Sequence, residues 1–179
     1  MKLALIRHAK PLIAPGICYG RLDIPVDPAA AGITAGIVLD PGLRGATRVW
    51  TSPALRCRQL ADAIAETLAA SLSVDARLQE LDFGAWEGLA WDSVPRTELD
   101  RWAGSPMSFA PPGGESGSAL IDRVRAFETT LRHELKDCAI VSHGGPLKVL
   151  AALLNCQPID LLAPAQPMGT IIYVRVPAP

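Results

Sequence analysis

Two of the three histidines in this sequence directly follow short apolar runs. His8 comes after the run 3–6 and Arg7, and His143 comes after the run 139–142. In open parallel sheets, ligands bind in the crevice outside the carboxyl ends of the strands. We therefore expect both imidazoles in one crevice, although they are far apart in the chain. The third histidine, His133, lies in a charged stretch that is typical of a solvated helix face.

Arginines accompany both histidines. Arg7 precedes His8, and Arg56 falls in the first turn of a helix that Ser52 is expected to cap, with proline at its first position. Guanidinium groups match the oxygens of a phosphate, and helix N-termini attract negative charge. Gly144 marks a second helix start whose bare backbone approaches an anion closely. The sequence thus predicts a phosphate site, with an exposed surface cation as the alternative interpretation of Arg56.

Phosphoryl transfer from an alcohol also needs an acid that protonates the leaving oxygen. Three carboxylates, Glu80, Asp82 and Glu87, lie in the irregular stretch 79–90, which follows the strand-like segment 74–78. Glu80 is nearest to the strand end. The residue pattern alone does not rank the three carboxylates.

Several other chemistries lack the residues that they need. The sequence contains no phosphate-binding loop of the nucleoside-triphosphatase type and no His, Cys or Asp set with the spacing of a catalytic metal site. The stretch 114–118 resembles a nucleophile elbow but lacks the last glycine and does not follow a strand. Ser116 is expected to cap a helix instead. We therefore expect an enzyme that uses no metal and no cofactor.

Length and composition favour one globular domain over residues 1–179, of which 49% are hydrophobic and 20% charged. Seventeen basic against 18 acidic side chains give a net charge of -1, which argues against a nucleic-acid partner. No apolar run is long enough to span a membrane, so no membrane partner is expected. Four scattered cysteines without a C-x-x-C pair favour a reduced, cytoplasmic protein.

Apolar runs and helical periodicity alternate along the chain. This alternation predicts a three-layer α/β/α sandwich around a mainly parallel sheet. Strands are expected at 2–6, 47–51, 138–142 and 170–176, and helices at 28–39, 53–70, within 91–102, 117–136 and 145–154.

Six short stretches follow one another along the chain: LIRH at 5–8, CYGRLDIP at 18–25, TSPALR at 51–56, LQELDFGAWEG at 78–88, GGES at 113–116 and VSHGG at 141–145. Together they resemble the histidine phosphatase superfamily, which includes phosphoglycerate mutases and acid phosphatases. The resemblance implies a phosphoglycerate mutase-like fold and a phosphoric monoester hydrolase. The long insertion of the cofactor-dependent mutases is missing, which argues against mutase activity.

The resemblance implies a metal-independent mechanism through a phosphohistidine intermediate. His8 would attack phosphorus, and Glu80 would protonate the leaving alcohol and then activate water. The phosphoryl oxygens would be held by Arg7, Arg56, His143 and the Gly144 amide. His8 must be neutral for this attack, whereas a protonated His143 would bind the dianion better.

Within the superfamily, the stretch 18–25 resembles the α-ribazole phosphatases, which remove the 5′-phosphate of α-ribazole phosphate in cobalamin biosynthesis. This resemblance adds Tyr19 and Gly20 as substrate-binding candidates, and the expected partner is a small phosphorylated metabolite. A broad-specificity small-molecule phosphatase and a protein-phosphohistidine phosphatase are the alternatives. A non-catalytic binding module is disfavoured, because no catalytic position is lost. The sequence leaves the oligomeric state open, a homodimer included.

Aromatic residues concentrate in the segment 83–114, which is expected to form a lid over the crevice. Such rings can stack on a flat base, or they can pack the lid onto the sheet, and we favour packing. The residues are Phe83, Trp86, Trp91, Trp102 and Phe109.

Overall fold

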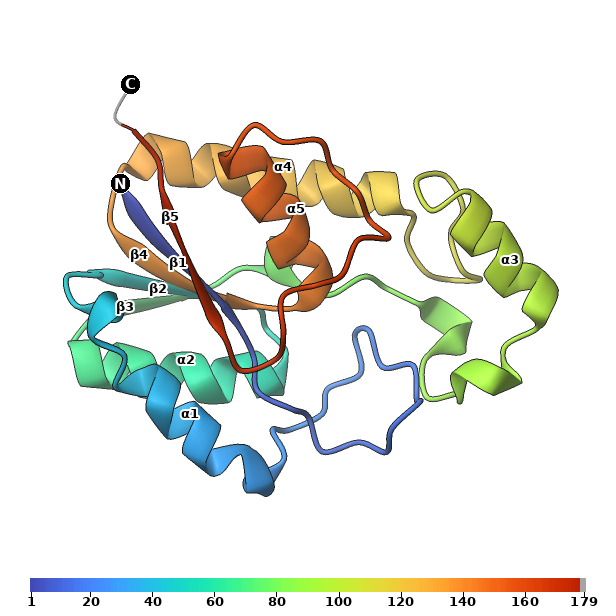
Figure 1. Cartoon of the computed structure of the whole chain (residues 1–179), viewed down its shortest axis with the longest axis horizontal. Coiled ribbons are helices and arrows are strands. Elements are labelled where there is room, and N and C mark those ends of the chain that lie inside the picture. The colour runs from blue at the N-terminus through green and yellow to red at the C-terminus, as the bar shows by residue number, and fades with distance from the viewer. Residues whose placement is uncertain (178–179) are drawn as a thin grey trace.

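The computed structural model describes residues 1–177, so the last two residues of the expected domain, 178–179, lie outside the described residues. Its centre is a five-stranded sheet with the strand order β3-β2-β4-β1-β5 (Figure 1). The first four strands in this order are parallel, and β5 runs antiparallel to β1. The strands are β1 (Lys2–Arg7), β2 (Arg48–Thr51), β3 (Ser71–Val74), β4 (Cys138–Ser142) and β5 (Ile171–Arg175).

The two central strands account for the continuous apolar runs in the sequence. Every residue of β4 is buried, and so are the four middle residues of β1. Such burial arises because helices cover both faces of a mainly parallel sheet. The two strands pair in parallel from Leu3 opposite Cys138 to Arg7 opposite Ser142, so their carboxyl ends lie side by side.

Helices form a layer on each face of the sheet (Figure 1). Leu5 of β1 packs into one apolar core with α4 (Gly117–Glu134) and α5 (Gly144–Leu154). Its neighbour Ile6 packs into a second core with α1 (Ala31–Val38) and α2 (Leu55–Leu68). These layers confirm the predicted α/β/α sandwich around a mainly parallel sheet. The remaining helix, α3 (Arg96–Gly104), stands away from the sheet within the segment 83–114.

Two local predictions about the ends of elements are wrong. Ser52 does not cap α2, which begins at Leu55; the backbone N–H of Leu55 donates instead to Asp23 Oδ1 at 2.6 Å. The segment 74–78 is not a strand, because β3 ends at Val74 and Ala76–Leu78 forms a 3-10 turn. The predicted cap at Ser116 is confirmed, since its hydroxyl accepts from the Ala119 N–H at 3.3 Å.

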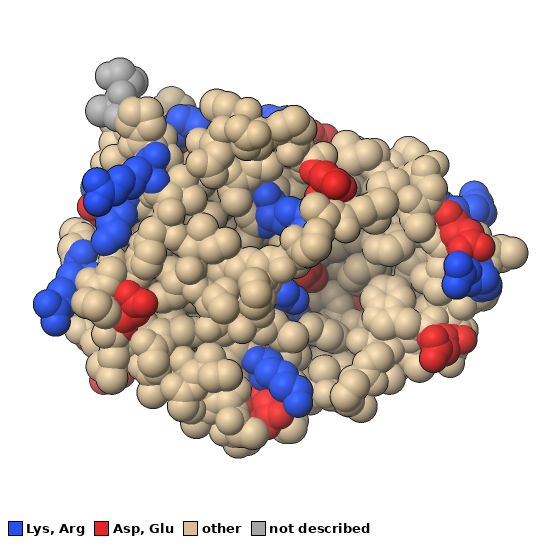
Figure 2. Space-filling model, in the orientation of Figure 1, with Lys and Arg blue, Asp and Glu red and all other residues tan. Residues whose placement is uncertain are grey.

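Charged side chains of both signs are interspersed on the face of the molecule shown in Figure 2, where a hollow opens right of the centre. Among the described residues, this face carries no continuous basic stripe of the kind that follows a nucleic-acid backbone. Within residues 1–177, no helix combines the length and the apolar character that a membrane crossing requires.

Candidate active site

The carboxyl ends of β1 and β4 place the two strand-end histidines against each other. Because Arg7 pairs with Ser142, the residues that follow, His8 and His143, emerge at the same edge of the sheet. Their ring centroids lie 5.1 Å apart, and each residue exposes only 1% of its surface. His133, in contrast, is exposed on α4. The structure thus brings together two of the three histidines and leaves the third on the surface.

Hydrogen bonding fixes the tautomer of His8. Its Nδ1 lies 2.6 Å from the carbonyl oxygen of Ala9. A carbonyl oxygen only accepts, so Nδ1 carries the proton and Nε2 keeps its lone pair. Burial, reinforced by the positive charges of Arg56 and Arg7, lowers the pKa of His8 to about 3, although the bond to Ala9 opposes the shift. His8 is therefore neutral near pH 7, with a nucleophilic Nε2.

His143 is held between a guanidinium and a hydroxyl. Arg56 Nη2 donates to its Nδ1 at 3.2 Å, so the ring proton sits on Nε2, which lies 2.8 Å from Ser52 Oγ. Burial lowers the pKa of His143 well below its usual value, and the positive groups nearby, among them Arg56 and Arg7, add to the effect. The free site therefore holds His143 neutral, and not in the protonated form that would best attract a dianion.

Arg7 and Arg56 are anchored by backbone carbonyls, and each keeps one buried donor that is not used in the described part of the chain. Arg56 donates through Nη1 to the Leu22 carbonyl and through Nη2 to the Gly20 carbonyl, each at 2.7 Å, and Arg7 Nη1 donates to the Gln166 carbonyl at 2.6 Å. The Nε–H groups of both arginines are buried and have no partner within residues 1–177. Because buried donors are normally paired, two open guanidinium donors in one site suit an anion.

Three further candidate residues contact these arginines. The Tyr19 ring lies 5.4 Å from the Arg56 guanidinium carbon, and the Gly20 carbonyl accepts from Arg56. A side chain at position 144 would place its Cβ 3.1 Å from the Arg7 guanidinium carbon. Glycine at this position therefore leaves space for the Arg7 side chain. The structure thus connects Tyr19, Gly20 and Gly144 to the site through the arginines.

Glu80 lies close enough to Arg7 and Arg56 for their charges to act on its carboxyl group. Its Oε1 accepts from the backbone N–H groups of Leu81 and Gly145, each at 3.1 Å. Burial of the carboxyl raises its pKa, although both N–H groups and the charges of Arg7 and Arg56 oppose the rise. A carboxyl with a raised pKa keeps its proton at a higher pH, which suits a general acid.

The other two carboxylates organise loops. Asp82 Oδ1 accepts from the Gly84 N–H at 2.9 Å, and its Oδ2 pairs with Arg21 at 3.2 Å. Glu87 Oε1 accepts from the backbone N–H groups of Arg21 and Phe83. The geometry therefore ranks Glu80 first among the three. We call Arg7, His8, Arg56, Glu80 and His143 the polar cluster.

A cavity of about 180 Å³ opens beside Glu80, between α4, α5 and the segment 83–114. Its walls are mainly apolar, and the rings of Phe83 and Trp102 form part of them, while Glu80 and Lys148 supply the ionisable side chains. Because Glu80 belongs to both the polar cluster and this cavity, a group that departs from the cluster toward Glu80 enters the cavity.

The aromatic residues of the segment 83–114 pack mainly against one another. Trp86 exposes 2% of its surface and stacks on Phe109 with a centroid distance of 6.0 Å. Phe83 meets Trp91 edge-on at 5.3 Å and Trp102 at 6.0 Å. Packing therefore accounts for Trp86, as favoured from the sequence, whereas Phe83 and Trp102 also face the cavity beside Glu80.

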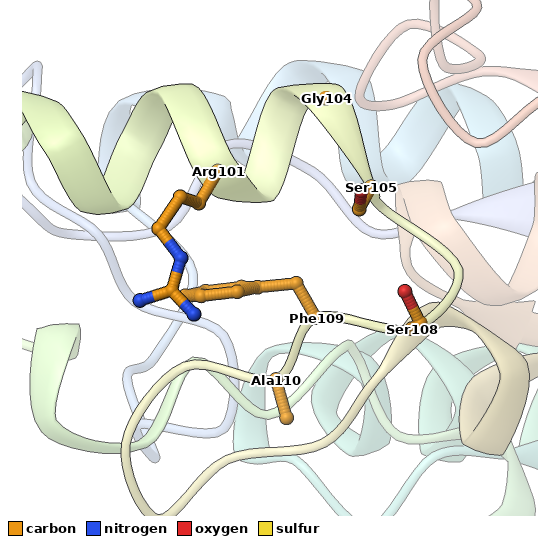
Figure 3. Close-up of a pocket in the computed structure, with 6 residues that line it drawn as sticks. All are labelled: Arg101, Gly104, Ser105, Ser108, Phe109 and Ala110. Atoms are coloured by element: carbon orange, nitrogen blue, oxygen red, sulfur yellow. The ribbon is translucent and has the colours of Figure 1, made fainter.

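A separate pocket of about 530 Å³ lies in the same segment, away from the polar cluster (Figure 3). The Arg101 guanidinium covers the ring of Phe109 at 5.1 Å, and the hydroxyl groups of Ser105 and Ser108 lie at the other side. All of its lining residues come from 101–110, so none belongs to the polar cluster. Within residues 1–177, no three His, Cys, Asp or Glu side chains are grouped as a metal site requires.

Sequence reasoning missed two residues that support the cluster. Ser52, expected as a helix cap, faces the ring of His143. Gln166 accepts from Arg7 through its carbonyl, and its side chain donates to the carbonyls of Leu5 and Thr170. The position of Ser52 at the end of β2, beside the predicted crevice, was a usable signal. Gln166 lies in a loop whose sequence contains no pattern that would have identified it.

The comparison with known families agrees with this geometry. A family model described as the histidine phosphatase superfamily (branch 1) matches residues 3–175. The chain belongs to the histidine phosphatase superfamily.

Relatives of this histidine phosphatase include a candidate phosphoserine phosphatase 2 of Hydrogenobacter thermophilus, 31% identical over 160 residues that cover 86% of this chain and 78% of that protein. The bifunctional protein Rv2228c of Mycobacterium tuberculosis is 32% identical over 161 residues, 85% of this chain but 43% of that longer protein. The α-ribazole phosphatase of Shigella flexneri shares the fold with a TM-score of 0.88 at 22% identity, covering 98% of this chain and 90% of that one. The chain is accordingly a phosphoric monoester hydrolase.

Proposed function

We propose that this chain hydrolyses small phosphomonoesters without a metal, through a phosphohistidine at His8. One observation carries the proposal. The neutral ring of His8, which donates from Nδ1 to Ala9, leaves the Nε2 lone pair free in a cluster where Arg7 and Arg56 each keep an unpaired buried Nε–H. A nucleophile and two hydrogen-bond donors for an anion lie buried in one site, which suits attack on a phosphoryl group.

In the first half of the reaction, His8 Nε2 forms a bond to phosphorus and the ester P–O bond breaks. Glu80, whose pKa is raised by burial, gives a proton to the leaving alkoxide. The guanidinium groups of Arg7 and Arg56 neutralise the charge that develops on the phosphoryl oxygens.

In the second half, a water molecule replaces the alcohol beside Glu80. The carboxylate takes a proton from the water as the water oxygen bonds to phosphorus, the N–P bond of the phosphohistidine breaks, and inorganic phosphate leaves. Glu80 is then protonated again, and His8 regains its Nε2 lone pair, so the cycle closes without an added reactant.

The substrate that we propose is α-ribazole 5′-phosphate, used in cobalamin biosynthesis in the cytoplasm. The stretch 18–25 supports this choice, because Tyr19 and Gly20 adjoin Arg56. The cavity beside Glu80 also supports it, since the rings of Phe83 and Trp102 offer flat walls to a planar base. We further propose that the segment 83–114 acts as a lid over this site within a single domain.

The test measures phosphate release in EDTA from α-ribazole 5′-phosphate, phosphoserine and p-nitrophenyl phosphate. His8→Ala is compared with His133→Ala, which removes an exposed imidazole from α4. We expect rapid hydrolysis of the ribazole ester, loss of activity in His8→Ala only, and an acid-labile phosphoenzyme in the wild type.

The outcomes separate mechanism from substrate. Activity that survives His8→Ala, or that disappears in EDTA, would overturn the phosphohistidine mechanism. A preference for phosphoserine, or similar slow turnover of all three esters, would keep the mechanism and reject α-ribazole phosphate as the substrate.

A further inference from the structure

Arg123 of α4 donates hydrogen bonds to the backbone around Glu80 and to the carboxylate of Glu115. Its Nη1 donates to the carbonyls of Arg77 at 2.7 Å and Gln79 at 2.6 Å, and its Nη2 donates to the carbonyl of Glu80 at 3.1 Å. The remaining donors, on Nε and Nη2, bind Glu115 at 3.1 and 2.6 Å. A guanidinium has five N–H donors, so every one of them is satisfied.

Glu115 holds two guanidiniums and a loop amide in place. Its Oε1 accepts from Arg21 Nη2 at 3.1 Å, from Arg123 Nη2 and from the backbone N–H of Asp82 at 3.1 Å. Burial alone would raise the pKa of Glu115, but the hydrogen bonds from Arg123 and the charge of Arg21 hold it below its usual value. Glu115 therefore stays ionised and fixes the orientation of both arginines.

These contacts hold the backbone of Glu80 and leave its carboxyl group free. The carbonyl of Glu80 accepts from Arg123, whereas the carboxyl, within the described range 1–177, accepts only from the N–H groups of Leu81 and Gly145. Neither Arg123 nor Glu115 lines the cavity beside Glu80. Side-chain exposures of 16% and 14% show that both ions are largely buried. Removing two such charges from water costs free energy. We take this cost as a sign that the ion pair serves to hold the backbone at this position.

We propose that Arg123, oriented by Glu115, is a positioning residue that sets the distance between the Glu80 carboxyl and the departing oxygen of the substrate. The inference rests on the proposed function, because it assigns Arg123 to the proton transfer in the first half of that reaction. Misplacement of a catalytic group by about 1 Å costs on the order of a hundredfold in rate. Loss of Arg123 therefore affects the acid step more than the other steps.

The test compares an ester that needs the acid with one that does not. An alkyl phosphate such as glycerol 3-phosphate has a poor leaving group that must be protonated, whereas p-nitrophenolate leaves without help. In Arg123→Met we expect kcat/KM to fall about a hundredfold for the alkyl ester and to change little for p-nitrophenyl phosphate. Because kcat/KM reports the first irreversible step, the later use of Glu80 as a base does not mask this difference.

Two further variants complete the experiment. Arg125→Met removes an exposed arginine of the same helix, which forms an ion pair with the exposed Asp122 at 3.1 Å, and is expected to match the wild type on both esters. Arg123→Lys keeps a positive charge beside Glu115 and covers the case in which Arg123→Met does not fold. It is expected to show a smaller loss with the same preference for p-nitrophenyl phosphate.

The results distinguish this inference from the proposed function. Equal losses on the two esters, or no loss on either, in a folded Arg123 variant would overturn the positioning role and leave the phosphohistidine mechanism standing. A wild-type enzyme that hydrolyses neither ester and forms no phosphohistidine would overturn the proposed function and this inference together.

Discussion

Acidification is expected to destabilise this protein through the buried imidazole of His8. The unfolded chain binds a proton at this histidine below pH 6.5, whereas the folded chain, with a His8 pKa of about 3, stays neutral there. The unfolded state therefore binds more protons between pH 6.5 and about 3, and the free energy of unfolding falls as the pH falls through this window.

The size of this effect follows from the pKa difference. At pH 5, which lies 1.5 units below 6.5, a cost of 1.36 kcal/mol per unit gives a loss of about 2 kcal/mol relative to neutral pH. This is a large part of an unfolding free energy of about 5–15 kcal/mol. His143 contributes in the same direction, because its pKa is also lowered, whereas Glu80, with a raised pKa, works against it.

Urea denaturation at pH 7 and pH 5 measures this difference. Replacement His8→Gln removes the titrating group, so the variant should lose about 2 kcal/mol less than the wild type between the two pH values. The contribution of Glu80 is present in both proteins. Because His8 also lowers the pKa of His143, His8→Gln removes part of the His143 contribution as well, so the difference from the wild type should be at least about 2 kcal/mol. His133→Gln, on the exposed face of α4, should behave as the wild type. If His8→Gln loses as much stability as the wild type, the burial argument is refuted.

Three further predictions concern Glu80, Gly20 and Ser52. Glu80→Gln removes the transferable proton, so kcat/KM for alkyl esters should fall about 10²–10⁴-fold. The wild-type rate should decline as the pH rises through the pKa of Glu80, and this decline should be absent in the variant. A decline that persists in Glu80→Gln would contradict the assignment of the acid. Gly20→Ala places a Cβ closer than 3.0 Å to backbone and carboxylate atoms and should destabilise by about 1–3 kcal/mol in urea. Gly32→Ala, with open space around its Cβ inside α1, should instead stabilise by about 0.5–1 kcal/mol, and equal effects of the two substitutions would contradict the packing argument. Ser52→Ala leaves the buried Nε2–H of His143 with the weak acceptor Cys57 Sγ, at 3.5 Å, in place of a hydroxyl, and should cost about 1 kcal/mol of unfolding free energy; an unchanged urea midpoint would show that the bond to Ser52 is not formed in solution.

The sequence by itself determined the two strands that carry the site and the place of the two histidines. Residues 3–6 and 138–141 are apolar without interruption, and a strand covered on both faces buries every side chain of such a run. Because parallel strands end at one edge, a polar residue after each run was enough to predict that His8 and His143 share a crevice. These inferences depend on local patterns and on a general rule of sheet geometry, which a single sequence contains.

Other features depend on contacts between residues that are distant in the chain, and only the tertiary structure decided them. Ser52 has the side chain of a helix cap, but Asp23 from another loop takes the Leu55 N–H, and Ser52 turns to His143. Glu80 was selected among its neighbouring carboxylates by the family resemblance and not by a local physical pattern. Its raised pKa, which the sequence does not reveal, arises from burial by elements that pack around it. The Arg123 bonds to three carbonyls likewise form only when α4 packs against the segment 77–80. The spacing of residues along the chain does not reveal which distant groups the fold brings within hydrogen-bond distance.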